Sequence, residues 1–320
     1  MKLLITGGAG FIGSHLAEEL LAKGQQVVVL DNLSTGRYEN IEHLFKIKNF
    51  GFVEGDILNA VLMDKLVEQV DAVFHLAAAV GVNLIVSRPL ESLTTNIKGS
   101  EIVLDAALRY RKKILITSTS EIYGKNVNGP LKEDDDRILG SPLKSRWSYS
   151  TAKAVDEMLA YIYWKEKKLP SIIVRLFNTV GPRQTGAYGM VIPRFVSQAL
   201  KNEDITVYGT GEQSRCFLHV KDTVGALIKL MNEPKAVGEV YNIGSQEEIT
   251  IEKLAQEIIL ATNSKSKIIH VSYTQAYEEG FEDMQRRVPD ISKVNKLIGF
   301  SPMISLARII EDVVNYCKNE

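Results

Sequence analysis

The sequence predicts an α/β protein in which helices cover both faces of a doubly wound parallel sheet. Three observations lead to this fold class. Apolar segments of strand length alternate with helical segments through the first half of the chain, as in parallel sheets built from strand–helix–strand units. A glycine-rich turn joins the first strand to the first helix, and an acidic residue follows the second strand. The later elements are shorter, which predicts a smaller C-terminal α/β substrate-binding domain.

The first element is a strand over residues 2–6, followed by Gly7, Gly10 and Gly13 and a helix over residues 14–22. A glycine turn between a strand and a helix lets the backbone approach a pyrophosphate closely, and the helix N-terminus supplies N–H donors and positive dipole. Gly13 also removes a side chain where the helix must pack against the strand. This combination predicts a Rossmann-type dinucleotide-binding domain.

The second strand, over residues 26–30, is followed by Asp31, eighteen residues after Gly13. A carboxylate at this place can accept hydrogen bonds from both hydroxyls of an adenine ribose, and it repels a 2′-phosphate. We therefore expect NAD, rather than NADP, as the cofactor.

The following elements continue the alternation. Strands are expected over residues 50–54, 72–76, 113–117 and 171–177, and helices over residues 61–69, 93–110 and 148–168. We expect residues 1–178 to form the NAD-binding Rossmann domain, together with parts of 215–232 and 291–305. Residues 179–320 are expected to form the smaller domain, interleaved with the first. Ligands of such sheets bind beyond the carboxyl ends of the strands.

The composition argues against several classes of partner. The chain has 38 basic and 39 acidic residues among 320, a net charge of −1, so neither nucleic acid nor an anionic membrane is favoured. Two cysteines are too few for a disulfide framework or a cysteine-based zinc site. There is no apolar run of membrane-spanning length and no signal peptide before the first strand. We expect a cytoplasmic protein without a metal site.

A tyrosine and a lysine form the first candidate for chemistry. Tyr149 and Lys153 are four residues apart on a predicted helix, so their side chains project from one face. An ammonium and an oxidised nicotinamide would pull the phenol pKa below its ordinary value of about 10. Tyr149 could then act as a general base near neutral pH. Thr119 adds a hydroxyl at the end of a preceding strand.

These motifs resemble the extended short-chain dehydrogenase/reductase superfamily, in its NAD-dependent epimerase/dehydratase family of nucleotide-sugar enzymes. The resemblance covers essentially the whole chain. It rests on the glycine turn, on Thr119-Ser120-Glu121-x-Tyr123-Gly124 and on Tyr149-x-x-x-Lys153. Further matches are Arg175-x-Phe177-Asn178-x-x-Gly181-Pro182-Arg183, Val207-Tyr208-Gly209 and Arg215-x-Phe217-x-His219-Val220.

The resemblance implies a set of site residues. The catalytic group is Tyr149, Lys153, Thr119, Glu121 and Ser120. The cofactor-binding group is Gly7, Gly10, Phe11, Ile12, Gly13, Asp31, Asn32, Ser34, Thr35, Gly36, Asp56, Ile57, Leu76, Ala77, Ala78, Asn96, Thr117, Ser118, Tyr149, Lys153 and Phe177. The group facing a UDP-sugar is Thr119, Tyr149, Asn178, Val191, Tyr208, Arg215 and Arg287. Two arginines and an amide also suit a diphosphate, which guanidinium groups bind bidentately.

Several reactions are compatible with these residues, because all begin with oxidation at sugar C4. We favour a UDP-sugar 4-epimerase acting on UDP-glucose/UDP-galactose or UDP-glucuronate/UDP-galacturonate. The alternative is a UDP-glucuronate decarboxylase (UDP-xylose synthase), in which the 4-ketone makes C6 the carboxyl of a β-keto acid. Asn32-Leu33-Ser34-Thr35-Gly36 and Tyr149-Ser150-Thr151-Ala152-Lys153 look more like epimerases, whereas Thr119-Ser120-Glu121 and Arg287-x-Pro289-Asp290-Ile291 are found in decarboxylases and in some uronate-accepting epimerases.

Two other functions are less favoured. A 4,6-dehydratase typically has an aspartate where this chain has Ser120, and a hydroxyl is a poor proton donor. A catalytically silent NAD-binding regulator usually lacks the tyrosine or the lysine, and both are present here.

The resemblance also implies a homodimer. The helices over residues 93–110 and 148–168 would pair across a two-fold axis as a four-helix interface. The apolar residues expected on this face are Leu104, Leu108, Met158, Tyr161 and Ile162.

Overall fold

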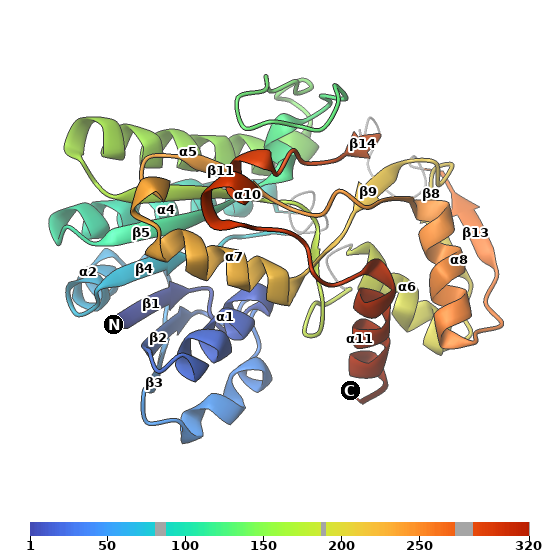
Figure 1. Ribbon diagram of the computed structural model, residues 1–320, viewed down its shortest axis with the longest axis horizontal. Coiled ribbons are helices and arrows are strands. Elements are labelled where there is room, and N and C mark those ends of the chain that lie inside the picture. The colour runs from blue at the N-terminus through green and yellow to red at the C-terminus, as the bar shows by residue number, and fades with distance from the viewer. Residues whose placement is uncertain (81–87, 187–189, 273–283, 320) are drawn as a thin grey trace.

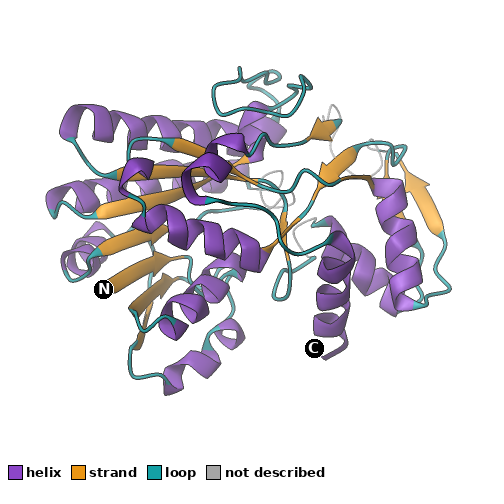
Figure 2. Ribbon diagram, viewed as in Figure 1, coloured by secondary structure: helices purple, strands orange, loops and turns teal. Residues whose placement is uncertain are grey.

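The structure is a computed structural model that describes residues 1–80, 88–186, 190–272 and 284–319. Its main feature is a seven-stranded parallel sheet with the strand order β11-β6-β5-β4-β1-β2-β3 (Figures 1 and 2). The strands of this sheet are β1 (Lys2–Thr6), β2 (Gln26–Asp31), β3 (Phe50–Glu54), β4 (Ala72–His75), β5 (Lys113–Thr119), β6 (Ser171–Leu176) and β11 (Val240–Ile243). The predicted Rossmann-type fold class is confirmed.

Helices cover both faces of the sheet, as Figure 1 shows. The helices of one face are α1 (Phe11–Ala22) and α7 (Val220–Asn232), and those of the other are α2 (Ala60–Glu68), α4 (Pro89–Arg109) and α5 (Ser148–Lys167). Side chains of a strand alternate between its two faces. Accordingly, Leu3 and Ile5 pack in the core under α1 and α7, while Leu4 packs in the core under α2, α4 and α5.

A smaller lobe lies to the right of the sheet in Figure 1. It has its own apolar core between α6 (Val191–Leu200), α8 (Ile251–Thr262) and α11 (Leu306–Asn319). Its strands are short and form three small sheets: β8 (Ile205–Tyr208) with β13 (Ile268–Val271), β12 (Glu248–Thr250) with β9 (Ser214–Cys216) and β14 (Arg286–Arg287), and β10 (Leu218–His219) with β7 (Thr179–Val180).

The chain crosses between the lobes more than once. β11 returns to pair with β6 in the main sheet, and α10 (Ser292–Ile298) packs against β11 and α7. Short 3-10 helices complete the connections: η1 (Tyr38–Asn40), η2 (Glu42–Lys46), η3 (Ser120–Tyr123), η4 (Ser145–Trp147) and η5 (Pro234–Ala236). The domain boundary at residue 178 remains a prediction.

Some element bounds differ from the sequence-based expectations. The first helix begins at Phe11 rather than at residue 14, because Gly10 is extended and acts as its N-cap. The long helix begins at Pro89 rather than at residue 93, since proline is well suited to the first turn. β5 extends two residues further than expected, to Thr119. That extension places the Thr119 hydroxyl at the carboxyl end of the strand.

Among the described residues, no helix has the length and apolar character needed to cross a membrane.

Candidate active site

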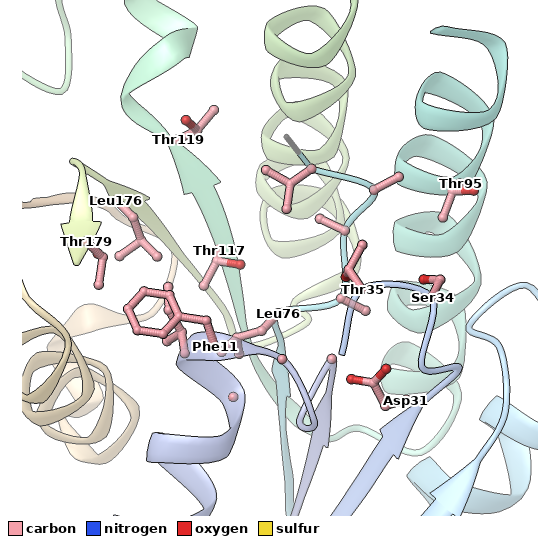
Figure 3. Close-up of a pocket in the computed structure, with 18 of the residues that line it drawn as sticks. Phe11, Asp31, Ser34, Thr35, Leu76, Thr95, Thr117, Thr119, Leu176 and Thr179 are labelled. Carbon is pink, nitrogen blue, oxygen red and sulfur yellow. The ribbon is translucent and has the colours of Figure 1, made fainter. Parts of the chain in front are cut away.

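A cavity of about 760 Å³ opens at the carboxyl ends of the main-sheet strands. Figure 3 shows Asp31, Ser34 and Thr35 toward one end of it, Thr119 toward the other, and Phe11 and Leu76 between them. The smaller lobe contributes Met190 and Arg287 to the wall. The cavity is therefore elongated and lined by both lobes, as a bound dinucleotide beside a second ligand would require.

The glycine turn has no room for side chains. Gly7 has a φ of +73°, and a Cβ there would lie 2.7 Å from the backbone nitrogen of Ala77. A Cβ on Gly13 would lie 2.2 Å from the carbonyl oxygen of Gly7. Gly10 begins α1 without a side-chain cap, which leaves the first N–H groups of the helix facing the cavity. Such a turn suits a pyrophosphate.

Asp31 is held rigidly at the end of β2. Its Oδ2 accepts a hydrogen bond of 2.9 Å from the backbone nitrogen of Ala9, and its Oδ1 accepts one of 2.9 Å from Leu33. Gly36 lets the following loop close over the carboxyl group, since a Cβ there would lie 2.7 Å from Oδ1. Burial raises the pKa of Asp31, whereas its backbone hydrogen bonds lower it. The carboxyl group lines the cavity where ribose hydroxyls are expected.

The part of the cavity wall next to Asp31 is formed by side chains that hydrogen-bond to one another. The Asn32 amide donates a 2.8 Å hydrogen bond to Asp56 Oδ2, and its oxygen accepts from both the backbone and the hydroxyl of Ser34. Thr35 and Ile57 line the same region. These contacts organise the end of the cavity that suits the adenosine of a dinucleotide.

Four predicted cofactor residues do not line the cavity: Gly36, Asn96, Lys153 and Phe177. Asn96 is buried, and its amide donates to and accepts from the backbone of Ala79 at 3.1 and 2.8 Å. It therefore shapes the loop after β4, in which Leu76 and Ala78 line the cavity. Phe177 is fully buried in the small core beside Tyr123.

The remaining predicted cofactor residues have mixed positions. Those that line the cavity are Gly7, Gly10, Phe11, Ile12, Gly13, Leu76, Ala77, Ala78, Thr117, Ser118 and Tyr149. Gly36 and Lys153 stand just behind this wall, Gly36 against Asp31 and Lys153 on α5 one turn after Tyr149.

The predicted catalytic residues converge at the opposite end of the cavity. Thr119, Ser120 and Glu121 follow one another at the end of β5, and Tyr149 faces the same space from the start of α5. Lys153 is buried, and its Nζ donates a 2.8 Å hydrogen bond to Asp156 Oδ2.

The electrostatics at Tyr149 differ from the sequence-based expectation. Burial raises the pKa of Tyr149, and the charges of Glu121 and Asp156 raise it further. The expected lowering by Lys153 is not seen, and the Lys153 ammonium is paired with Asp156. A low phenol pKa would therefore need positive charge from the cofactor's oxidised nicotinamide.

Sequence reasoning missed Arg146. This residue lies three positions before Tyr149 and is only 4% exposed. Its guanidinium donates two hydrogen bonds to Glu121, at 2.7 and 3.2 Å. Arg287 approaches the same carboxylate at 3.8 Å and donates to Ser120 Oγ at 3.3 Å. Two cations thus surround one carboxylate beside Tyr149, an arrangement with no local sequence signal because it joins three distant segments.

The predicted substrate residues are brought together only in part. Asn178 and Arg287 line the cavity along with Thr119 and Tyr149. Val191, Tyr208 and Arg215 are not among the described residues of its wall.

Each of these three lies in the smaller lobe. Val191 begins α6, and Arg215 is buried on β9, where it donates to the carbonyl of Ser214 at 2.8 Å. The Tyr208 ring lies under the guanidinium of Arg194, 4.3 Å from ring centroid to Cζ.

The cavity wall also contains Arg183, a residue of the Arg175–Arg183 motif to which the sequence analysis assigns no role. It has a φ of +70° and forms an ion pair with Glu18 of α1 and a 3.2 Å hydrogen bond with Ser14. Although burial raises the pKa of Glu18, hydrogen bonds from His15 and Arg183 bring it down to about 2. Arg183 thus fastens the loop after β7 to the first helix.

Comparisons with known proteins agree with this geometry. A sequence profile of the family described as GDP-mannose 4,6 dehydratase matches residues 4–313. The chain belongs to this family of NAD-dependent epimerases and dehydratases. The predicted membership of the extended short-chain dehydrogenase/reductases is thereby confirmed.

Three similar proteins of the family cover nearly the whole chain. UDP-N-acetyl-alpha-D-glucosaminuronate decarboxylase of Bacillus cytotoxicus is 44% identical, over 98% of this chain and 97% of its own. UDP-glucuronic acid decarboxylase 1 of Danio rerio is 36% identical, over 100% of this chain and 73% of its own. The crystal structure of UDP-glucuronic acid 4-epimerase from Bacillus cereus, in complex with UDP-glucuronic acid and NAD, has a TM-score of 0.90 and 30% identity, covering 100% of this chain and 99% of its own.

The prediction of a 4-epimerase, and of an isomerase as the enzyme class, is wrong. The more similar curated relatives are decarboxylases, even though epimerase structures share the fold. The reason lies in where the epimerase-like motifs are placed. The segment Asn32–Gly36 lies at the Asp31 end of the cavity, and Tyr149 with Lys153 is expected to serve only the oxidation at C4 with which both reactions begin. Neither motif therefore distinguishes a reaction that removes C6 from one that keeps it.

Proposed function

We propose that this protein is an NAD-dependent decarboxylase of a UDP-linked glucuronate. The observation that carries the proposal is the identity of the decarboxylase relatives, which match this chain over nearly its full length. The site supports it, because Glu121, Arg146 and Arg287 are gathered beside Tyr149, where the sugar ring of a UDP-linked substrate would lie.

The cofactor is NAD, and the residues present fit it. Gly7, Gly10 and Gly13 leave room for the pyrophosphate, and Asp31 faces the position of a ribose. Bound NAD supplies the hydride acceptor and donor for sugar C4, which keeps the overall reaction redox neutral.

Tyr149 would take the proton of the sugar 4-hydroxyl, while the hydroxyl of Thr119 would hold that oxygen by a hydrogen bond. The 4-ketone then makes C6 the carboxyl of a β-keto acid, so that the electrons of the breaking C5–C6 bond enter an enolate and carbon dioxide leaves. C5 afterwards gains a proton, and Tyr149 returns its proton to O4. The net reaction consumes one proton and releases one carbon dioxide.

The charged residues around Tyr149 would orient this substrate. Arg287 provides positive charge for an anionic substrate and lines the cavity beside Ser120. Glu121 is fixed by Arg146, and its carboxylate can accept hydrogen bonds from ring hydroxyls. We assign both arginines to binding and positioning.

We propose UDP-N-acetylglucosaminuronate as the preferred substrate and UDP-glucuronate as the second. The two share the C4–C6 part on which the reaction depends and differ at C2. The relative named for the N-acetyl sugar is 44% identical, against 36% for the one named for UDP-glucuronic acid.

The test is product analysis with each substrate carrying a carbon label at C6. Stoichiometric release of labelled carbon dioxide together with a UDP-pentose, or its 2-acetamido form, is the expected result. Tyr149→Phe is the matched control and should release carbon dioxide about 10²–10⁴-fold more slowly. A 4-epimer that retains the labelled carboxylate would refute the proposal.

We also propose a homodimer formed through α5 and α4. Met158, Tyr161 and Ile162 are exposed on α5, as such an interface needs. Leu104 is fully buried against the sheet and is not available, which corrects its predicted place in the interface. Leu108 is partly buried against the same core. A cytoplasmic location remains a prediction.

A further inference from the structure

Asp156 is a buried carboxylate that the proposed reaction does not use. It lies on α5 three residues after Lys153 and is fully buried. Its Oδ2 accepts the 2.8 Å hydrogen bond from Lys153 Nζ, whereas its Oδ1 is buried without a hydrogen-bond partner among the described residues. A buried acceptor left unsatisfied is costly. Such a group is expected where it has a function that offsets the cost.

Asp156 is the counter-ion of Lys153, since the other titratable group close to this ammonium is neutral. His75 of β4 is the other titratable group whose electrostatics involve Lys153, and its ring hydrogen-bonds Thr6 at 2.7 Å and Ser100 at 3.1 Å. Burial, and then the charge of Lys153, lowers the pKa of His75 to about 3, so the ring is neutral. The ammonium of Lys153 therefore has its charge balanced by Asp156.

The groups around Tyr149 come from several elements. Glu121 of η3 contributes negative charge, which Arg146 of η4 and Arg287 of β14 balance at 2.7 and 3.8 Å. On α5 itself, Lys153 and Asp156 form the second pair. Each carboxylate near the phenol is therefore held by a cation.

We propose that Asp156 is a positioning residue that acts through Lys153. It holds the ammonium in a buried ion pair and so sets the pH at which Tyr149 becomes a base. The inference rests on the part of the proposed function that makes Tyr149 the base, but not on decarboxylation.

The direction of the effect follows from the charges. A negative charge near a phenol favours its neutral form, and a nearby charge typically shifts a pKa by about 1–3 units. Asp156→Asn keeps the shape of the side chain and removes that charge. The uncompensated ammonium of Lys153 then acts on Tyr149 in the same direction, toward the phenolate.

The experiment is a spectroscopic titration of the NAD-loaded protein, without substrate. The phenolate absorbance of wild type and Asp156→Asn is measured against pH. The chain has 12 tyrosines, so each protein is compared with its own Tyr149→Phe counterpart to isolate one phenol. Glu166→Gln is the matched control, because it removes one exposed negative charge from the same helix.

Asp156→Asn is expected to move the titration of Tyr149 down by about one pH unit, with no movement in Glu166→Gln. The acid limb of the kcat/KM profile should move by the same amount. A titration that stays in place or moves up would overturn the proposal, even if Asp156→Asn is less stable, since a merely structural role predicts lower stability alone. If Asp156→Asn does not fold, Asp156→Ser replaces it in the same titration. Because no substrate is present, a failure of the decarboxylation proposal leaves this result unaffected.

Discussion

Replacing Arg146 by methionine should destabilise the protein far more than removing an ordinary surface charge. The Arg146–Glu121 pair joins two side chains that are 4% and 14% exposed through hydrogen bonds of 2.7 and 3.2 Å. Removing one partner of a buried pair typically costs about 3–5 kcal/mol, because the other charge stays buried. Arg287 remains 3.8 Å from the carboxylate and offsets part of this. We therefore expect Arg146→Met to lower the free energy of unfolding by about 3 kcal/mol, at the low end of that range.

Urea unfolding at saturating NAD, followed by tryptophan fluorescence, measures this effect. Trp147 is a suitable reporter, because it is buried and the guanidinium of Arg146 lies 5.6 Å from the centre of its ring. The control is Arg109→Met, whose ion pair with Asp64 is similarly short, at 2.8 Å, but involves an arginine that is 65% exposed. It should cost about 0–1 kcal/mol.

The double variant Arg146→Met with Glu121→Leu examines the cause of the loss. Replacing both partners of a buried pair by apolar residues can be nearly neutral. The double variant should therefore recover at least about 1.5 kcal/mol relative to the sum of the single variants, within the usual range for residues in contact. Additive losses, or an Arg146→Met cost no larger than that of Arg109→Met, would refute the reasoning.

Four further predictions concern the cofactor, the chemistry and the assembly. Tyr149→Phe should lower kcat by about 10²–10⁴-fold and leave KM nearly unchanged, as steady-state kinetics would show; a loss confined to KM would contradict its role as base. Gly13→Ala should abolish copurification of NAD, because its Cβ would lie 2.2 Å from a backbone oxygen. Gly225→Ala is the control: its Cβ would meet open space, so the free energy of unfolding should rise by about 0.5–1 kcal/mol. Asp31→Asn should weaken NAD binding by about 10–100-fold, measured by calorimetry, through the loss of charge-assisted hydrogen bonds to a ribose, and undiminished affinity would contradict that assignment. Met158→Arg should shift the protein to a monomer in analytical ultracentrifugation, because a charge would be buried in the proposed interface, and an unchanged dimer would exclude this face.

Much of the main sheet could be predicted because its signals are local. The residues of β1, the glycine turn and the end of β2 are neighbours in the chain, and their period and spacing follow from the geometry of strands and helix termini. Where the bounds of the predicted elements differ, they differ by a few residues at element ends, whereas the place of β11 beside β6 was not predicted. Gly10 and Pro89 allowed helices to start earlier than the apolar pattern suggested.

Site residues could be predicted only where the local motif itself determines that the residue lines the cavity. Asn96 and Phe177 belong to segments that line or support the wall, but which side of the wall each occupies depends on packing. Arg183 stood within a matched motif, yet its partner Glu18 lies far away in the sequence. Spacing alone contains no information about such contacts.

Neither the strand and helix pattern nor the site motifs could decide which reaction the protein catalyses. In the proposed mechanism Tyr149, Lys153 and Thr119 serve the oxidation at C4, a step with which epimerases and decarboxylases both begin. The sequence motifs therefore pointed to a nucleotide-sugar enzyme with NAD, while full-length similarity to decarboxylases corrected the reaction.

By itself, then, the sequence determined the parallel sheet, the dinucleotide turn with Asp31 and the tyrosine–lysine pair, because each depends on residues close together in the chain. Only the tertiary structure decided the charges around Tyr149. Arg146 and Arg287 reach Glu121 from two other segments, and Asp156 balances Lys153 in a buried ion pair. The strength of a charge depends on burial and on its neighbours in space, and folding sets both.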